Sequence, residues 1–319
     1  MPTTNEATSD TTTDDAVIDA EFSVLDDSFA RTSGQFVDKV YSNRAGTRPY
    51  KLYIPSSYTG QAIPLVVMLH GCTQTSIDFA AGTRMNALAE GKTFLVAYPE
   101  QGASANSSKC WNWFQETEQR RNSVEPSIIA GITHQIMSQY HINEGQVYIA
   151  GLSSGGAMAA IMAATYPDLY AAVGVHSGLP YGAANDLPSA FAAMKQGSPQ
   201  YALSLPEFIP LIVFHSDRDM TVAPVNADHL LDQWLNTANK GPMRVQKVRV
   251  EQGQAARGHA YTRSNYYDVS GRTIIEKWLI HQAGHAWSGG NPSGSFTDPK
   301  GPDASAEMIR FFMEHARVI

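Results

Sequence analysis

The sequence contains no apolar segment close to the roughly 20 residues that a membrane-spanning helix requires. Its longest apolar runs, such as residues 64–69, have the length of single strands. The N-terminus also lacks a basic segment followed by an apolar one, which is the pattern of a secretion signal. We therefore expect no membrane partner and, from these features alone, a cytoplasmic protein.

Cysteine is nearly absent, because the 319 residues include only Cys72 and Cys110. Two thiols are too few for a zinc cage, and no histidine and cysteine spacing resembles one. We therefore expect no metal site. The two cysteines could be free buried thiols or a single disulfide, and the missing secretion signal favours thiols.

An excess of positive charge is also absent, since the formal net charge is −7. Residues 1–33 hold eight acidic residues and one basic residue, Arg31, while the rest of the chain holds 22 of each sign. A neutral body gives no electrostatic reason to expect a nucleic-acid partner. The Thr-, Ser- and Asp-rich composition of 1–33 predicts a disordered acidic leader, followed by one domain over 34–319.

Apolar periodicity in that domain predicts alternating strands and helices, and so a mostly parallel sheet with helices on both faces. Residues 177–207 are rich in Gly, Pro, Ala and Ser and predict a small insertion over the top of the sheet. The expected strands cover 35–44, 49–55, 64–69, 94–98, the stretch from 146, 171–175, 210–214, 244–251, 260–268 and 273–280; the expected helices cover 76–90, 125–140, the stretch ending near 165, 225–238 and 303–316.

The stretch 146–158 has the composition of a nucleophile elbow. An apolar strand runs into Gly151-Leu152-Ser153-Ser154-Gly155, and an alanine- and methionine-rich helical pattern follows. Glycines at both ends of the motif allow a sharp turn that exposes the central serine hydroxyl. We expect Ser153 to be a nucleophile, with the Ser154 backbone N–H free at the start of the helix to bind an anion. A flexible glycine turn is the alternative reading.

A carboxylate is expected after strand 210–214, because in this kind of sheet the acid follows the serine and precedes the histidine in the chain. Both Asp217 and Asp219 lie in that loop. We favour Asp219, which lies far enough into the loop to turn back towards a histidine. The alternative role for either residue is that of a solvated loop acid.

A general base is expected after the last strand. His285 lies among small residues that let its ring reach a serine, whereas His281 directly continues strand 273–280. We favour His285 as the base. His176 and His215 end strands and are expected to be structural, and the remaining histidines on polar stretches are expected at the surface: His134, His141, His229, His259 and His315.

An oxyanion hole is expected where strand 64–69 ends in His70-Gly71-Cys72-Thr73. The loop after this strand supplies a backbone donor in serine hydrolases of this type. We expect the Cys72 N–H to act with that of Ser154. A strand-end turn without this role is the alternative reading.

Five segments together resemble the polyhydroxybutyrate depolymerase family of esterases, which are α/β-hydrolases related to carbohydrate esterase family 1. The resemblance covers about residues 35–316. It rests on His70-Gly71-Cys72-Thr73-Gln74-Thr75, Tyr98-Pro99-Glu100-Gln101, Cys110-Trp111-Asn112-Trp113-Phe114, Gly151-Leu152-Ser153-Ser154-Gly155-Gly156-Ala157-Met158 and Gly284-His285-Ala286-Trp287-Ser288-Gly289-Gly290. One departure lies outside these segments, in the loop that carries the candidate acids. Such hydrolases usually have glycine at the position of Ser216, and this departure leaves Asp217 open as the acid.

The resemblance implies a serine esterase acting on poly- or oligo(3-hydroxyalkanoate) esters, with Ser153, Asp219 and His285 as its triad and no cofactor. It implies a Cys72–Cys110 disulfide over the site, and it allows an extracellular location. Trp111, Trp113 and Trp287 are the expected substrate surface, with burial in the core as the alternative. Feruloyl or acetylxylan esterase activity is the alternative function, and a noncatalytic scaffold is the second. The sequence specifies no oligomeric state.

Overall fold

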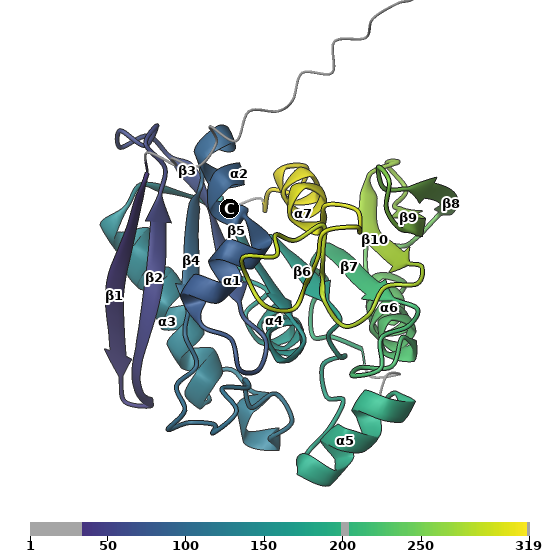
Figure 1. Cartoon of the computed structure of the whole chain (residues 1–319), viewed down its shortest axis with the longest axis horizontal. Helices are drawn as coiled ribbons and strands as arrows, with labels where there is room; N and C mark the ends of the chain where they lie inside the picture. The colour runs from purple at the N-terminus through teal and green to yellow at the C-terminus, as the bar shows by residue number, and fades with distance from the viewer. Residues whose placement is uncertain (1–33, 199–203, 318–319) are drawn as a thin grey trace, which may run out of the picture. The chain divides into compact units, whose positions relative to one another are not determined.

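The computed structural model describes residues 34–198 and 204–317, which belong to one compact unit (Figure 1). The predicted acidic leader lies outside the described residues. Within the described ranges, no helix is long and apolar enough to cross a membrane.

A ten-stranded sheet forms the centre of this unit, in the order β1-β2-β4-β3-β5-β6-β7-β10-β9-β8. Six neighbouring strands of the sheet pair in parallel, in the order β4, β3, β5, β6, β7 and β10. The strands at the two edges pair antiparallel. The strands are β1 (Gln35–Asn43), β2 (Gly46–Ile54), β3 (Ile63–Leu69), β4 (Leu95–Pro99), β5 (Ile142–Leu152), β6 (Ala172–His176), β7 (Leu211–Ser216), β8 (Lys247–Gln254), β9 (Ala260–Tyr267) and β10 (Thr273–Ile280). The central strands are apolar throughout because helices cover both of their faces.

Helices pack on both faces of the sheet, and each face has its own apolar core (Figure 1). One core includes side chains of α3, α4 and α6, and the other includes side chains of α1, α2 and α7. The helices are α1 (Ser76–Thr83), α2 (Met85–Lys92), the short 3₁₀ helix η2 (Glu116–Glu118), α3 (Val124–Gln139), α4 (Ser154–Thr165), α5 (Leu187–Gln196), α6 (Val225–Ala238) and α7 (Ala304–Met313).

The expected helix over 76–90 is instead two short helices. Arg84 ends α1 in the left-handed region, with a φ of 53°, and its N–H donates to the Ala80 carbonyl. The Arg84 guanidinium donates to the Gly289 carbonyl and to Asp303. The break between α1 and α2 is therefore held by partners more than 200 positions away along the chain, which helical periodicity does not encode.

The expected insertion at 177–207 contains α5, which lies beyond the lower edge of the sheet in Figure 1. Its N-terminus is capped by Asp186, whose carboxylate accepts from the Ser189 N–H at 2.8 Å. Residues 282–301, which follow β10, contain two short paired strands, β11 (Trp287–Ser288) and β12 (Thr297–Asp298). Both segments follow the carboxyl ends of parallel strands, where sites form in open α/β sheets.

The prediction that His315 lies at the surface is wrong. Its ring is buried, with Nδ1 2.7 Å from the Phe311 carbonyl oxygen and Nε2 2.6 Å from that of Thr273. Burial lowers the pKa of this histidine. A histidine in a polar stretch of sequence can therefore still be buried, where it links a terminal helix to a strand.

Candidate active site

Ser153 occupies a sharp turn between β5 and α4. Its backbone is strained, with φ 57° and ψ −118°, and its N–H donates to the His176 carbonyl at 2.9 Å. A Cβ atom at Gly151 would collide with the backbone of Gly155, and one at Gly155 would collide with the Leu69 carbonyl. Only glycine fits at these two positions, so the motif forms a strand–turn–helix elbow with the serine at its tip.

Asp219 and His285 meet at the same end of the sheet, after β7 and β10. His285 Nδ1 lies 2.6 Å from Asp219 Oδ2, while Asp219 Oδ1 accepts from the backbone N–H groups of Thr221 and Val222 at 2.9 Å each. Burial raises the pKa of Asp219, but the hydrogen bond with His285 and the neighbouring imidazoles outweigh it, so the pKa is lowered. This carboxylate can therefore stay charged and fix the orientation of the His285 ring.

Two further histidine rings lie buried beneath this pair. His176 Nε2 accepts from the Ser288 N–H at 3.0 Å, and His215 Nε2 lies 2.9 Å from the Val222 carbonyl oxygen. Burial lowers the pKa of His176 to about 3 and also lowers that of His215. Both rings are therefore neutral near pH 7, and they hold the loops of the site in place from below.

Asp217 pairs with His281, immediately beside the first pair. His281 Nδ1 lies 2.9 Å from Asp217 Oδ2, its Nε2 lies 2.9 Å from the Thr262 hydroxyl, and the Gln282 N–H donates to Asp217 Oδ1 at 2.7 Å. Both candidate acids thus hold a histidine. Only Asp219 holds the one that lines a cavity together with Ser153.

The three backbone N–H groups of residues 71–73, which follow β3, differ in whether they have a hydrogen-bond acceptor. The Gly71 N–H donates to Gln74 Oε1 at 2.9 Å, and the Thr73 N–H donates to the Ser108 carbonyl at 2.7 Å. Within residues 34–198 and 204–317, the Cys72 N–H between them has no hydrogen-bond acceptor. Ser154 is the first residue of α4, so its N–H has no acceptor within the helix. Both residues line the larger cavity together with Ser153.

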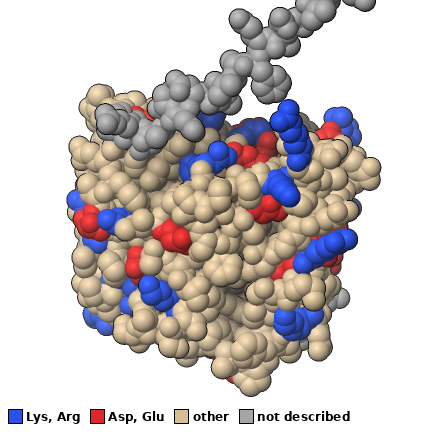
Figure 2. Space-filling view, in the orientation of Figure 1, with Lys and Arg blue, Asp and Glu red and all other residues tan. Residues whose placement is uncertain are grey.

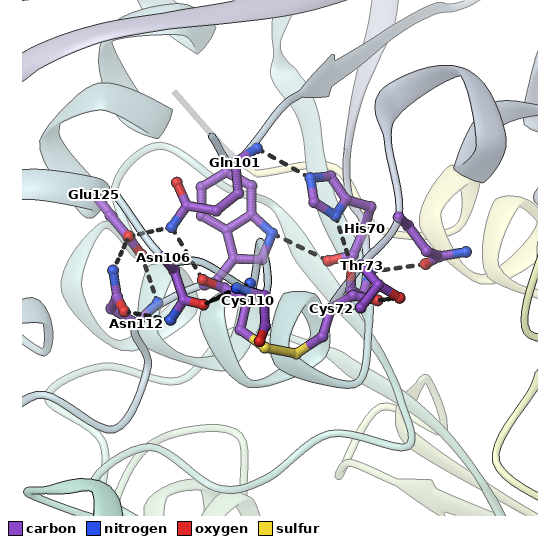
Figure 3. The surroundings of a disulfide bond; sticks show 12 residues. His70, Cys72, Thr73, Gln101, Asn106, Cys110, Asn112 and Glu125 are labelled. Atoms are coloured by element: carbon purple, nitrogen blue, oxygen red, sulfur yellow. Dashed lines mark hydrogen bonds between the residues drawn. A yellow bond between two sulfur atoms is a disulfide. The ribbon is translucent and has the colours of Figure 1, made fainter. Parts of the chain in front are cut away.

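A disulfide joins Cys72 to Cys110 and so links this donor loop to the loop after β4 (Figure 3). The second loop is held from within by Glu125, whose carboxylate accepts from the Asn112 N–H at 2.8 Å and from the Asn112 side chain at 2.6 Å. Burial raises the pKa of Glu125 to about 7. No local sequence pattern marks this buried carboxylate, because its partners lie on other segments of the chain.

Ser153 lines two cavities. The larger, of about 530 Å³, extends past Ser154, the disulfide and Trp113 to the side chains of α5. The smaller, of about 160 Å³, contains His285, Thr221 and Phe296. The two cavities adjoin, because Cys72, Thr73 and Met194 also line both, and only the smaller one is lined by the histidine.

The three tryptophans have different positions. Trp113 lines the larger cavity, but Trp111 and Trp287 are each only 1% exposed and line neither cavity. The Trp111 Nε1–H donates to the His70 carbonyl at 3.1 Å, and the Trp287 Nε1–H donates to Ser305 at 3.0 Å. The expectation that Trp111 and Trp287 form the substrate surface is corrected: both rings support the site from within the protein.

Charged side chains of both signs are interspersed over the face shown in Figure 2, without a large patch of one sign. This face offers no broad electrostatic field for a polyanion.

The family model and the relatives that match this chain agree on one family of esterases. The family model described as "Esterase PHB depolymerase" matches residues 48–251. Poly(3-hydroxyalkanoate) depolymerase C of Paucimonas lemoignei is 31% identical over 256 residues, which are 75% of this chain and 59% of that protein. Acetylxylan esterase A of Talaromyces purpureogenus is 29% identical over 240 residues, covering 65% of this chain and 61% of the relative. The chain thus spans about three-fifths of the length of these relatives.

Among solved structures, an acetyl xylan esterase from Aspergillus awamori superposes with a TM-score of 0.65 at 20% identity, covering 88% of this chain and 99% of the other. A structure described as a thermostable esterase superposes with a TM-score of 0.52 at 18% identity, covering 88% of this chain and 63% of the other. At these identities the likeness concerns the fold, and it confirms the predicted α/β-hydrolase architecture.

Proposed function

Because the chain belongs to the esterase PHB depolymerase family, we propose that it hydrolyses carboxylic esters with Ser153 as nucleophile, His285 as general base and Asp219 as the acid that orients the base. One observation carries this proposal: His285, which is paired with the buried Asp219, lines the same small cavity as the strained elbow serine. A scaffold protein would have no need to keep these groups together around an open space.

In the proposed reaction, Ser153 Oγ attacks the ester carbonyl carbon and gives its proton to His285 Nε2. Asp219 stabilises the resulting imidazolium through Nδ1–H. The Cys72 and Ser154 N–H groups hold the oxyanion. The carbon–oxygen bond to the alcohol then breaks, and the alkoxide takes the proton from His285. A water molecule activated by the same ring releases the acid and restores the serine, without a metal or organic cofactor.

Replacing Ser153 by alanine tests the nucleophile. Hydrolysis of p-nitrophenyl butyrate should fall by about 10⁶-fold, as expected when a nucleophile of this kind is removed. Ser138→Ala is a matched control, because Ser138 lies on the exposed side of α3, where its hydroxyl donates to the Gln135 carbonyl. Turnover by a folded Ser153→Ala variant at the rate of the Ser138→Ala control would overturn the assignment. Covalent labelling by a fluorophosphonate separates an esterase from a scaffold, which would form no adduct on Ser153.

The substrate class proposed is poly- or oligo(3-hydroxyalkanoate) esters, supported by the family and by the name of the Paucimonas relative. A carbohydrate-directed acetyl or feruloyl esterase is the second candidate, supported by the names of the fungal relatives. Release of 3-hydroxybutyrate from its oligomers, measured beside acetate from acetylated xylan and ferulate from a feruloylated sugar, decides between them. Preferential release of acetate or ferulate would replace the first candidate by the second.

We further propose that the protein matures in an oxidising compartment, and so outside the cytoplasm that the sequence alone suggested. The Cys72–Cys110 disulfide supports this, since such bonds persist where thiols are not kept reduced. Titration of the denatured, nonreduced protein should find no free thiol; two free thiols would contradict the proposal.

A further inference from the structure

The two cavities beside Ser153 differ in which catalytic group they contain, and this assigns the two halves of an ester to them. This step rests on the proposed function. The leaving alkoxide must take its proton from His285, so it has to lie on the side of that ring. His285 lines only the smaller cavity, together with Thr221 and Phe296. The alcohol half therefore belongs to the smaller cavity.

The acyl half then extends from Ser153, past the Ser154 and Cys72 donors, into the adjoining larger cavity. Most of its lining there is apolar: Leu179, Ala190, Phe191, Met194, Trp113 and Phe114. Apart from Thr73, Ser153 and Ser154 near the proposed reaction centre, the polar residues of its lining are Asn106, Ser107 and Ser108. A space of about 530 Å³ is far larger than an acetyl group requires and is within the range of sites that enclose whole small molecules.

Helix α5 supplies the outer wall of this cavity. Leu187 is 52% exposed and Phe191 is 59% exposed, although both line the cavity and both are large apolar side chains. Exposed apolar groups gathered at the mouth of a cavity mark a place where a ligand covers them. An acyl tail lying along α5 would remove this surface from water.

We propose that α5 makes the protein selective for esters with an apolar acyl tail of about six to eight carbons over acetyl esters, and that Phe191 is a specificity-determining residue. Each buried methylene contributes about fourfold to binding, so several methylenes multiply into a large preference. An acetyl group would not reach Leu187, Ala190 or Phe191, the α5 side chains that line only the larger cavity, and would leave that cavity to water. An enzyme specific for acetylated xylan would show the reverse preference, for acetyl over longer acyl groups.

The test is the kcat/KM for p-nitrophenyl acetate, butyrate, hexanoate and octanoate. For the wild-type protein we expect a rise of at least tenfold from acetate to octanoate. Phe191→Ala should lower the octanoate-to-acetate ratio at least threefold while changing the acetate value less than twofold. Because the Phe191 side chain is mostly exposed, the Phe191→Ala variant should fold. A second variant, Ala190→Phe, narrows the cavity from the same helix and should lower kcat/KM for octanoate more than for acetate.

Phe296→Ala is the matched control, since Phe296 is also an exposed phenylalanine but lines only the smaller cavity. It should leave the octanoate-to-acetate ratio within twofold of the wild-type ratio. A wild-type preference for acetate, or an equal change of the ratio in Phe191→Ala and Phe296→Ala, would overturn the assignment of α5. If Ser153→Ala is inactive in the same assays, the esterase proposal stands whatever the ratio shows.

Discussion

Two aspartate–histidine pairs lie side by side at the ends of β7 and β10, and they have nearly the same contact geometry. The distance from Nδ1 to the carboxylate is 2.6 Å in the Asp219–His285 pair and 2.9 Å in the Asp217–His281 pair. They differ in burial. The side chains of Asp219 and His285 are 0% and 11% exposed, whereas those of Asp217 and His281 are 36% and 33% exposed.

The two pairs also differ in what the second ring nitrogen faces. In His281 this nitrogen lies 2.9 Å from the Thr262 hydroxyl, on a neighbouring strand of the sheet. His285 instead lines a cavity beside Ser153. A carboxylate on a histidine therefore does not identify a catalytic pair. What separates the two is the group beyond the ring, together with the exclusion of water that strengthens the interaction.

The largest difference between the pairs should appear when each histidine is replaced. His285→Gln should lower kcat for p-nitrophenyl butyrate by roughly 10⁶-fold, because the serine loses its base. His281→Gln should lower it by less than about fivefold, since glutamine can still contact Asp217. Steady-state kinetics of the two variants measure this, and equal losses would show that the pairs act as one unit.

The next largest difference should come from the carboxylates. Asp219→Asn should lower kcat by about 10⁴-fold, because an amide favours the wrong tautomer of the histidine. Asp217→Asn should lower kcat by less than tenfold, through a looser backbone at Gln282. A loss in Asp217→Asn that matches that in Asp219→Asn would assign the acid to both residues.

A smaller effect is expected on stability at low pH, to which Asp217 of the more exposed pair contributes. Burial raises the pKa of Asp217, but the hydrogen bonds from His281 and the Gln282 N–H outweigh it and lower the pKa below its ordinary value of 3.8. A lowered pKa in the folded state stabilises the protein above pH 3.8, and this contribution is lost as the pH falls through the folded value. Urea unfolding between about pH 5 and pH 2.5 should therefore show a shallower loss of stability in Asp217→Asn than in the wild-type protein. Parallel curves would contradict this.

The smallest effect is expected at Thr262. Thr262→Val removes the hydroxyl that faces His281 and should change the free energy of unfolding by about 1 kcal/mol or less, because the site is partly open to water. Esterase activity should stay within twofold of the wild-type value. A large loss of activity would mean that this hydroxyl takes part in the chemistry of the neighbouring pair.

The sequence could predict the α/β-hydrolase fold, the family and the residues that meet at the site, because each of these lies in a local pattern. The elbow glycines and the strand-end positions of Asp219 and His285 are local in this sense. The sequence could not decide which way a tryptophan faces: Trp111 and Trp287 are buried by partners distant in the chain. The Glu125 network and the break at Arg84 were missed for the same reason, since both depend on contacts between separate elements.

Helix α4 is buried along its whole length, and this bears on how the protein responds to heat. All twelve residues from Ser154 to Thr165 are buried, whereas α5 exposes Leu187 and Phe191. Backbone amides of α4 should exchange with deuterium only when most of the domain opens, while those of α5 should exchange through local opening. On warming, the wall against the acyl tail would loosen before the elbow does. Discrimination between chain lengths should then fade at temperatures at which hydrolysis itself still proceeds.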